Sequence, residues 1–127
     1  GTKTKILGVT ILTSLDQKQT LKYYNEKNIT NLVKKYAKYA KQNKLNGLVC
    51  SPLEIEIVRK EVGGKMILVV PGIRLENNLS NNGDDQKRTL TPKEAIQLGA
   101  DYLVIGRPII ESKNPLETIK RINQSIQ

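Results

Sequence analysis

The chain has 127 residues, and its 21 lysines and arginines against 12 aspartates and glutamates give a formal net charge of +9. This length suits one domain, and 38% hydrophobic with 26% charged residues is typical of a globular chain rather than a disordered or fibrous one. No apolar run approaches the ~20 residues of a membrane helix or has the form of a signal peptide. The sequence contains no histidine and one cysteine, Cys50, which excludes a His-based triad, a His-ligated metal and an intrachain disulfide. We expect a cytoplasmic protein without a membrane partner.

The positive charge does not by itself indicate a nucleic-acid-binding protein. The lysines are spread along the whole chain, only five basic residues are arginine, and phenylalanine and tryptophan are absent. The tyrosines do not alternate with arginine, as they would in an RNA-binding surface. We interpret the charge as a solvated, lysine-rich surface and expect no nucleic-acid partner.

In the first half of the chain, apolar runs alternate with amphipathic ones. Residues 6–12 are β-branched and almost free of charge, which predicts a buried strand. After a polar stretch, residues 28–43 carry apolar side chains at helical spacing, and residues 47–50 form a second short strand. Ser51 then has the features of an N-cap, with Pro52 at the first helical position and Glu54 at the capping-box position. This helix is predicted to end at Gly63-Gly64.

The second half repeats the pattern. Residues 66–70 predict a third strand, followed by a long polar loop that extends to Arg88. Thr91, Pro92 and Glu94 repeat the helix-start pattern, and that short helix is predicted to end at Gly99. Residues 102–105 predict the fourth strand, and residues 115–126 the last helix.

Four consecutive strand–helix units predict an α/β fold with a parallel sheet and helices packed outside it. Two architectures fit: a small open doubly wound sheet, or half of a (β/α)8 barrel. A closed barrel needs ~250 residues, so the barrel interpretation requires a second half. A half barrel would expose apolar edges, and we do not expect it to be a stable monomer.

Functional residues in such folds gather where the strands end. Thr13 and Ser14 follow the first strand, Arg74 the third, and Gly106-Arg107 the fourth. Glycine lets a ligand approach the backbone closely, and arginine is a forked donor suited to phosphate oxygens. Two interpretations stay open for Gly106-Arg107: a phosphate site, or a tight turn with an exposed arginine.

Other residues carry weaker signals. The polar loop at residues 81–88 is typical of a lid over a ligand or of a solvated connection. Its adjacent aspartates, Asp84 and Asp85, are not spaced as a metal site, and Cys50 is predicted to be a buried, inert thiol. Lys5 and Lys65 precede their strands, at the wrong end for a barrel active site. No catalytic acid or base stands out.

Taken together, five segments resemble the C-terminal half of the orotidine 5′-phosphate decarboxylase family, and the bacterial branch in particular. They are residues 9–14, 47–51, 71–74, 83–88 and 101–108. The resemblance implies the last four units of a (β/α)8 barrel, spanning residues 1–127. It also implies a homodimer that converts orotidine monophosphate to UMP without a metal or organic cofactor.

The resemblance also implies roles for individual residues. Thr13 and Ser14 would lie near the pyrimidine ring, and Arg74 would begin a phosphate-gripping loop. Gln86 would reach from that loop toward phosphate and base. The Gly106 amide and the Arg107 guanidinium would hold the phosphate itself.

The chain departs from the family in that it contains no Asp-x-Lys-x-x-Asp motif, which supplies the proton-donating lysine. Strands one to four of the barrel are also expected to be missing, together with the aspartate that the family supplies across the dimer interface. We therefore expect no catalytic residue in this chain and no turnover by the chain alone. Because it starts at Gly1 without methionine, we expect a piece of a longer product, whose other half is an upstream extension, a separate chain or lost. The alternatives are another phosphate-binding barrel half, such as a sugar-phosphate decarboxylase or epimerase relative, and a non-catalytic nucleotide-binding remnant.

Overall fold

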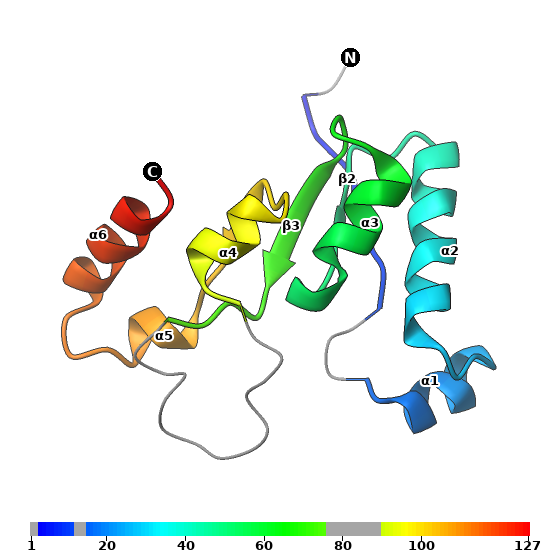
Figure 1. Ribbon diagram of the computed structural model, residues 1–127, viewed down its shortest axis with the longest axis horizontal. Helices are drawn as coiled ribbons and strands as arrows, with labels where there is room; N and C mark the ends of the chain where they lie inside the picture. Colours follow the sequence, from blue (N-terminus) through cyan, green and yellow to red (C-terminus); the bar gives the residue numbers. More distant parts are fainter. Residues whose placement is uncertain (1–2, 12–14, 76–89) are drawn as a thin grey trace.

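The computed structural model describes residues 3–11, 15–75 and 90–127. Four strands and their intervening helices follow one another along the chain (Figure 1). The strands are β1 (Leu7–Val9), β2 (Gly47–Val49), β3 (Ile67–Pro71) and β4 (Tyr102–Val104). The helices are α1 (Gln17–Tyr24), α2 (Ile29–Gln42), the 3-10 turn η1 (Pro52–Glu54), α3 (Ile55–Val62), α4 (Pro92–Gln97), α5 (Arg107–Ile110) and α6 (Pro115–Ser125).

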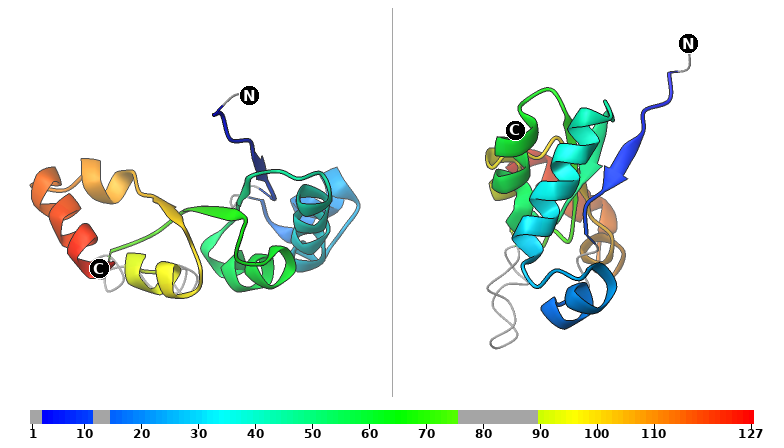
Figure 2. Two further views of the ribbon diagram at one scale, coloured as in Figure 1. Left: turned by 90° about the horizontal axis from the view of Figure 1, so that it is seen from above. Right: turned by 90° about the vertical axis from the view of Figure 1, so that its right-hand side faces the viewer.

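The sheet is entirely parallel, with the strand order β1-β2-β3-β4. This sequential order decides between the two predicted architectures, because a doubly wound sheet reverses its order and places helices on both faces. Seen from above, the strands trace an arc with α2, α3 and α4 along one side (Figure 2, left). The arrangement is that of half a (β/α)8 barrel, as predicted from the sequence.

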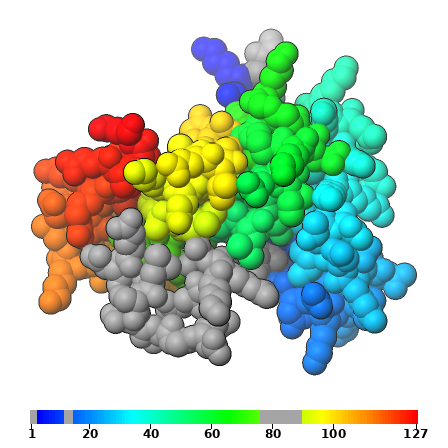
Figure 3. Space-filling view, viewed as in Figure 1, coloured from blue at the N-terminus to red at the C-terminus, as the bar shows by residue number. Residues whose placement is uncertain are grey.

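The core lies between the sheet and these helices. Leu48, Leu68 and Val70 on the outer face of the strands are fully buried against apolar side chains of the helical layer. Those side chains are Leu32, Val33 and Ala37 of α2, Ile55, Val58 and Val62 of α3, and Ala95 of α4. In the space-filling view, α2, α3 and α4 form a continuous surface in front of the strands (Figure 3). Among the described residues, no helix is long and apolar enough to cross a membrane.

Local signals position most helix ends as predicted. Asn28 caps α2 by accepting from the Asn31 N–H at 3.1 Å, and Gly63 closes α3. Thr91 and Glu94 form a reciprocal capping box at the start of α4. The predicted box at Ser51 is also present, but it opens the 3-10 turn η1, and the α-helix begins only at Ile55.

Two helices were not predicted from the sequence. Helix α1 lies in the polar stretch, where Asp16 and Gln19 form a capping box; its polar composition hides any apolar stripe. Helix α5 has only four residues and starts at Arg107, directly after Gly106. The predicted first strand was too long, since β1 ends at Val9, although the Thr10 N–H still donates to the Val49 carbonyl at 3.1 Å.

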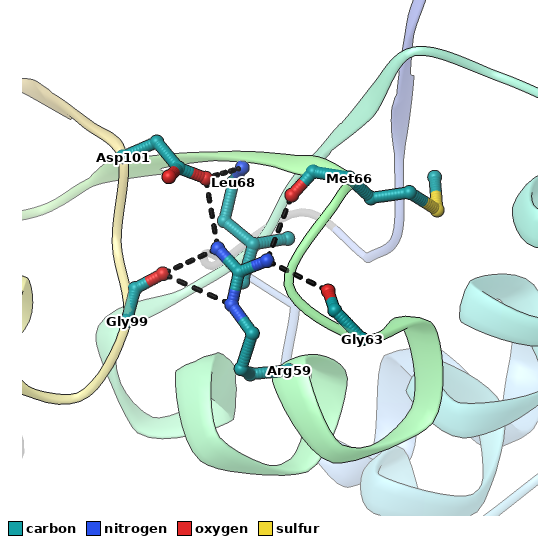
Figure 4. A network of polar contacts seen from close by, with 6 residues as sticks. All are labelled: Arg59, Gly63, Met66, Leu68, Gly99 and Asp101. Carbon is teal, nitrogen blue, oxygen red and sulfur yellow. Dashed lines mark hydrogen bonds and ion pairs between the residues drawn. The ribbon is translucent and has the colours of Figure 1, made fainter.

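A polar network where β3 and β4 begin ties α3 to these two strands (Figure 4). Its centre is the Arg59 guanidinium, 19% exposed, which donates to the carbonyls of Gly63 at 2.9 Å, Met66 at 2.8 Å and Gly99. The same guanidinium pairs with Asp101 at 2.8 Å. One side chain therefore satisfies three carbonyls, two in the α3–β3 connection and one in the α4–β4 connection, and holds the helix against both strands.

Asp101 completes this network, because its side chain and its backbone together form the hydrogen bonds that a strand residue would form with Leu68. Its carboxylate accepts the Leu68 N–H at 2.8 Å, and its own N–H donates to the Leu68 carbonyl at 3.0 Å. The regular ladder between β3 and β4 begins one residue later, at Val69 and Tyr102. The network therefore sets the register in which β4 runs toward its carboxyl end.

The inner face of the sheet is uncovered at its two edge strands within the described chain. Val9, Val49, Val69 and Tyr102 share one row across the four strands. Val9 and Tyr102, on the edge strands, are 57% and 59% exposed, whereas the two central valines are half-buried. In a closed barrel these side chains would fill the interior.

Candidate functional site

The candidate site lies at the end of the sheet where all four strands have their carboxyl ends. Because the strands are parallel, residues 72–75 and 105–107 emerge on the same side, near α5 at the lower edge of Figure 1. Pro71 pairs with Val104 at the end of the β3–β4 ladder. Arg74 and Gly106 therefore follow directly adjacent strands, so the structure places these two predicted site residues at one edge.

Arg74 is held by the backbone on both sides. Gly72 adopts φ +80°, a left-handed conformation that favours glycine, and turns the chain out of β3. Ile73 is 1% exposed and anchors the segment in the core. The Arg74 N–H then donates to the Leu90 carbonyl at 3.0 Å. This contact joins the two described segments that flank residues 76–89.

The segment after β4 is open toward solvent. A Cβ added at Gly106 would meet no atom within 4 Å, so there is room for a ligand to approach this backbone. The Gly106 carbonyl accepts the N–H groups of Ile109 and Ile110 at 2.9 and 3.2 Å, which fixes the turn. The Arg107 side chain is exposed, and no carboxylate of the described residues pairs with it. An exposed forked cation beside open backbone suits an oxyanion ligand.

The residues that directly follow β1 and β2, Thr10 and Cys50, are buried rather than open to solvent. Thr10 is 5% exposed, and both its N–H and its hydroxyl donate to the Val49 carbonyl. Cys50 is buried as predicted, and burial, with a smaller contribution from Glu54, raises the pKa of its thiol to about 12. Such a thiol is protonated at neutral pH and is neither a nucleophile nor a metal ligand.

Three of the six predicted site residues, Thr13, Ser14 and Gln86, lie outside the described residues, as does the predicted lid at residues 81–88. Within the described ranges, no group of three or more acidic or cysteine side chains is placed to hold a metal ion.

Sequence reasoning missed the residues that support Arg74. Ile73 lies within the segment 71–74 that carries the resemblance, and an isolated apolar residue between Gly72 and Arg74 is a signal for an anchor in the core. Nothing in the sequence indicates that the Leu90 carbonyl contacts Arg74, because a long loop separates the two residues. The capping box at Thr91 and Glu94, which was predicted, starts α4 directly after this contact.

Comparison with known proteins agrees with this geometry. Residues 1–122 match the family described as "Orotidine 5'-phosphate decarboxylase / HUMPS family". The chain is 46% identical over 127 residues to the orotidine 5'-phosphate decarboxylase of Wolbachia pipientis, covering 99% of this chain and 54% of that protein. It is 43% identical over 121 residues to the enzyme of the same name from Glaesserella parasuis, covering 95% of this chain and 51% of that one.

Solved structures show the same relationship. The crystal structure of orotidine 5'-phosphate decarboxylase from Lactobacillus acidophilus superimposes with a TM-score of 0.77 at 30% identity, covering 97% of this chain and 49% of that one. The enzyme of Pyrococcus horikoshii, at 23% identity and a TM-score of 0.67, shares the fold. The chain thus spans about half the length of the relatives it matches. It belongs to the orotidine 5'-phosphate decarboxylase / HUMPS family, as the motifs in its sequence predicted.

Proposed function

We propose that the chain is the C-terminal half of an orotidine 5′-phosphate decarboxylase, which converts orotidine monophosphate to UMP and CO2 in pyrimidine biosynthesis. In this proposal residues 1–127 supply the phosphate- and pyrimidine-binding loops of the barrel. The observation that carries it is the placement of Arg74 and Gly106-Arg107 at the ends of adjacent strands, with open space in front of Gly106. The match to decarboxylases over the whole chain supports this substrate class.

In the proposed complex, the Arg107 guanidinium and the Gly106 amide hold the substrate phosphate. Arg74 starts the loop that closes over it, and Gln86 in that loop bridges phosphate and base. Thr13 and Ser14 lie against the pyrimidine ring. Binding energy from the phosphate, which is remote from the reacting carbon, would orient the base and exclude water.

The chemistry itself requires groups that this chain does not contain. Loss of CO2 leaves a carbanion at C6 of the pyrimidine, and a protonated lysine must deliver a proton there. The sequence has no Asp-x-Lys-x-x-Asp segment to supply it. The proposal therefore assigns binding to this chain and proton transfer to a complementary N-terminal half, on the same or a separate chain. The homodimer, the cytoplasmic location and the inactivity of the chain alone stay predictions.

Binding of UMP, measured by isothermal titration calorimetry, tests the proposal. Arg107→Ala should weaken UMP binding at least tenfold, because a hydrogen-bonded charge contributes about 1.5–3 kcal/mol. Arg121→Ala removes an equally exposed arginine from α6, away from the site, and should leave the affinity unchanged. Ribulose 5-phosphate should bind more weakly than UMP. Equal affinity for the two ligands would favour a sugar-phosphate barrel, and an unchanged Arg107→Ala variant would contradict the assignment.

A further inference from the structure

The exposed apolar residues of the sheet are concentrated on its two edge strands. On β1, Leu7 and Val9 are 38% and 57% exposed, and on β4, Tyr102 and Val104 are 59% and 52% exposed. All four lie on the inner face, as the register of the ladder requires. The same face of β2 and β3 is half-buried or buried. The surface that lacks a partner is therefore at the two ends of the arc rather than at its middle.

Both edges also carry unpaired strand backbone within the described chain. There, β1 pairs only with β2, and β4 pairs only with β3. An exposed strand edge is a template for pairing with another strand. Strand β1 is the first strand of the arc and β4 is the last. Because the arc is open, β4 does not meet β1 of the same copy, but it can pair with β1 of another copy.

The helical layer is unfinished at the β4 edge as well. An open apolar hollow of about 200 Å³ lies between β4 and α6. Its lining is almost wholly aliphatic: Leu103, Ile105, Ile109, Ile119, Ile122 and Ile126, with Asn123 the single polar residue. In Figure 2 (left), α6 stands at the end of the arc beside α5, and no helix of the described chain lies beyond it. A helix packed next to α6 would close this hollow.

We infer that, where the complementary half is absent, the edges β1 and β4 are closed by a second copy of this chain. A two-fold axis along the centre of the arc places β4 of each copy beside β1 of the other, in the parallel sense. Four strands from each copy then complete an eight-stranded ring with no free edge. The exposed side chains of β4 meet those of β1, and α6 of each copy gains a neighbour in α2 of the other.

This contact differs from the homodimer that the family implies, in which whole barrels associate. It depends on the half-barrel architecture and not on ligand binding, so it can fail or hold independently of the proposed function. The chain has a net charge of +9, so two copies repel each other. Added salt screens that repulsion, and the self-association should therefore strengthen as ionic strength rises.

Sedimentation velocity of the purified 127-residue chain tests the inference. We expect a species of twice the 14.2 kDa chain mass at micromolar concentration and moderate salt. Tyr102→Lys should raise the dissociation constant at least tenfold. Tyr23→Lys is a matched control, because Tyr23 is 61% exposed but lies on α1, outside the sheet; it should leave the dissociation constant unchanged.

Amide hydrogen exchange on the unaltered chain keeps the inference testable if Tyr102→Lys fails to fold. Protection of the amides in Leu7–Val9 and Tyr102–Val104 should increase with protein concentration. A monomer at all concentrations would overturn the inference, as would a dimer that Tyr23→Lys weakens as much as Tyr102→Lys. Larger open-ended assemblies would also overturn it, because edge pairing that fails to close runs on into filaments.

Discussion

Replacing Arg59 with methionine should strongly destabilise the fold. The substitution keeps an unbranched side chain of comparable length but removes every guanidinium donor that joins α3 to β3 and β4. Hydrogen bonds to a charged group contribute about 1.5–3 kcal/mol each, and they do not add independently. Asp101 is 43% exposed and can regain water, which reduces the loss. We expect a decrease of about 2–4 kcal/mol in the free energy of unfolding.

Lys38→Met provides the matched control. Lys38 also pairs with a carboxylate, but its ammonium lies 3.9 Å from Glu61 and its side chain is 60% exposed. Such surface pairs contribute about 0–1 kcal/mol. Equilibrium urea unfolding followed by circular dichroism measures both variants, at one protein concentration because self-association would add a concentration-dependent term. If the two variants lost stability within about 0.5 kcal/mol of each other, the reasoning about the network would be refuted.

Three further changes test local features. Gly72→Ala should lower the free energy of unfolding in urea by about 1 kcal/mol because φ is +80° there. Gly64→Ala, at a glycine with open space around it, should be nearly neutral. Equal effects of the two substitutions would contradict the left-handed conformation of Gly72. Hydrogen bonds from the Thr91 backbone, then from its hydroxyl, lower the pKa of Glu94, so Glu94 stabilises the fold above its unfolded pKa and this contribution is lost as pH falls through the lower folded value. The stability difference between the unaltered chain and Glu94→Gln should therefore shrink in acid, and a pH-independent difference would exclude this linkage. Because burial raises the pKa of Cys50 to about 12, a thiol reagent at about pH 8 should modify it only as fast as the protein opens; labelling at the rate of an unfolded cysteine would show that the thiol is accessible.

Much of the fold was predictable because its signals are local. Proline after a capping residue marked η1 and α4, and β-branched runs marked the strands. The rule that the carboxyl ends of parallel strands lie together predicts that Arg74 and Gly106 share one end of the sheet. The choice between a doubly wound sheet and a half barrel was not predictable from periodicity, because both have the same sequence of elements. Strand order decided it.

The unpredicted features depend on contacts between distant residues or on weak patterns. Arg59 and Asp101 are separated by 42 positions, and nothing in the sequence near either residue indicates their pairing. Helix α1 has a recognisable capping box at Asp16 and Gln19 but no strong apolar face, so it was overlooked. The contact between Arg74 and Leu90 likewise joins residues on either side of a long loop. Sequence reasoning thus identified the candidate site residues better than the contacts that hold them in place.

Decarboxylation of orotidine monophosphate tests the central claim most directly. The assay compares this chain alone with a fusion in which it follows the part of the Wolbachia relative that it does not match. We predict no turnover by the chain alone, turnover by the fusion, and a strong loss of that turnover in the fusion with Arg107→Ala. Turnover by the chain alone, or a fusion that circular dichroism shows to be folded but that lacks activity, would contradict the account.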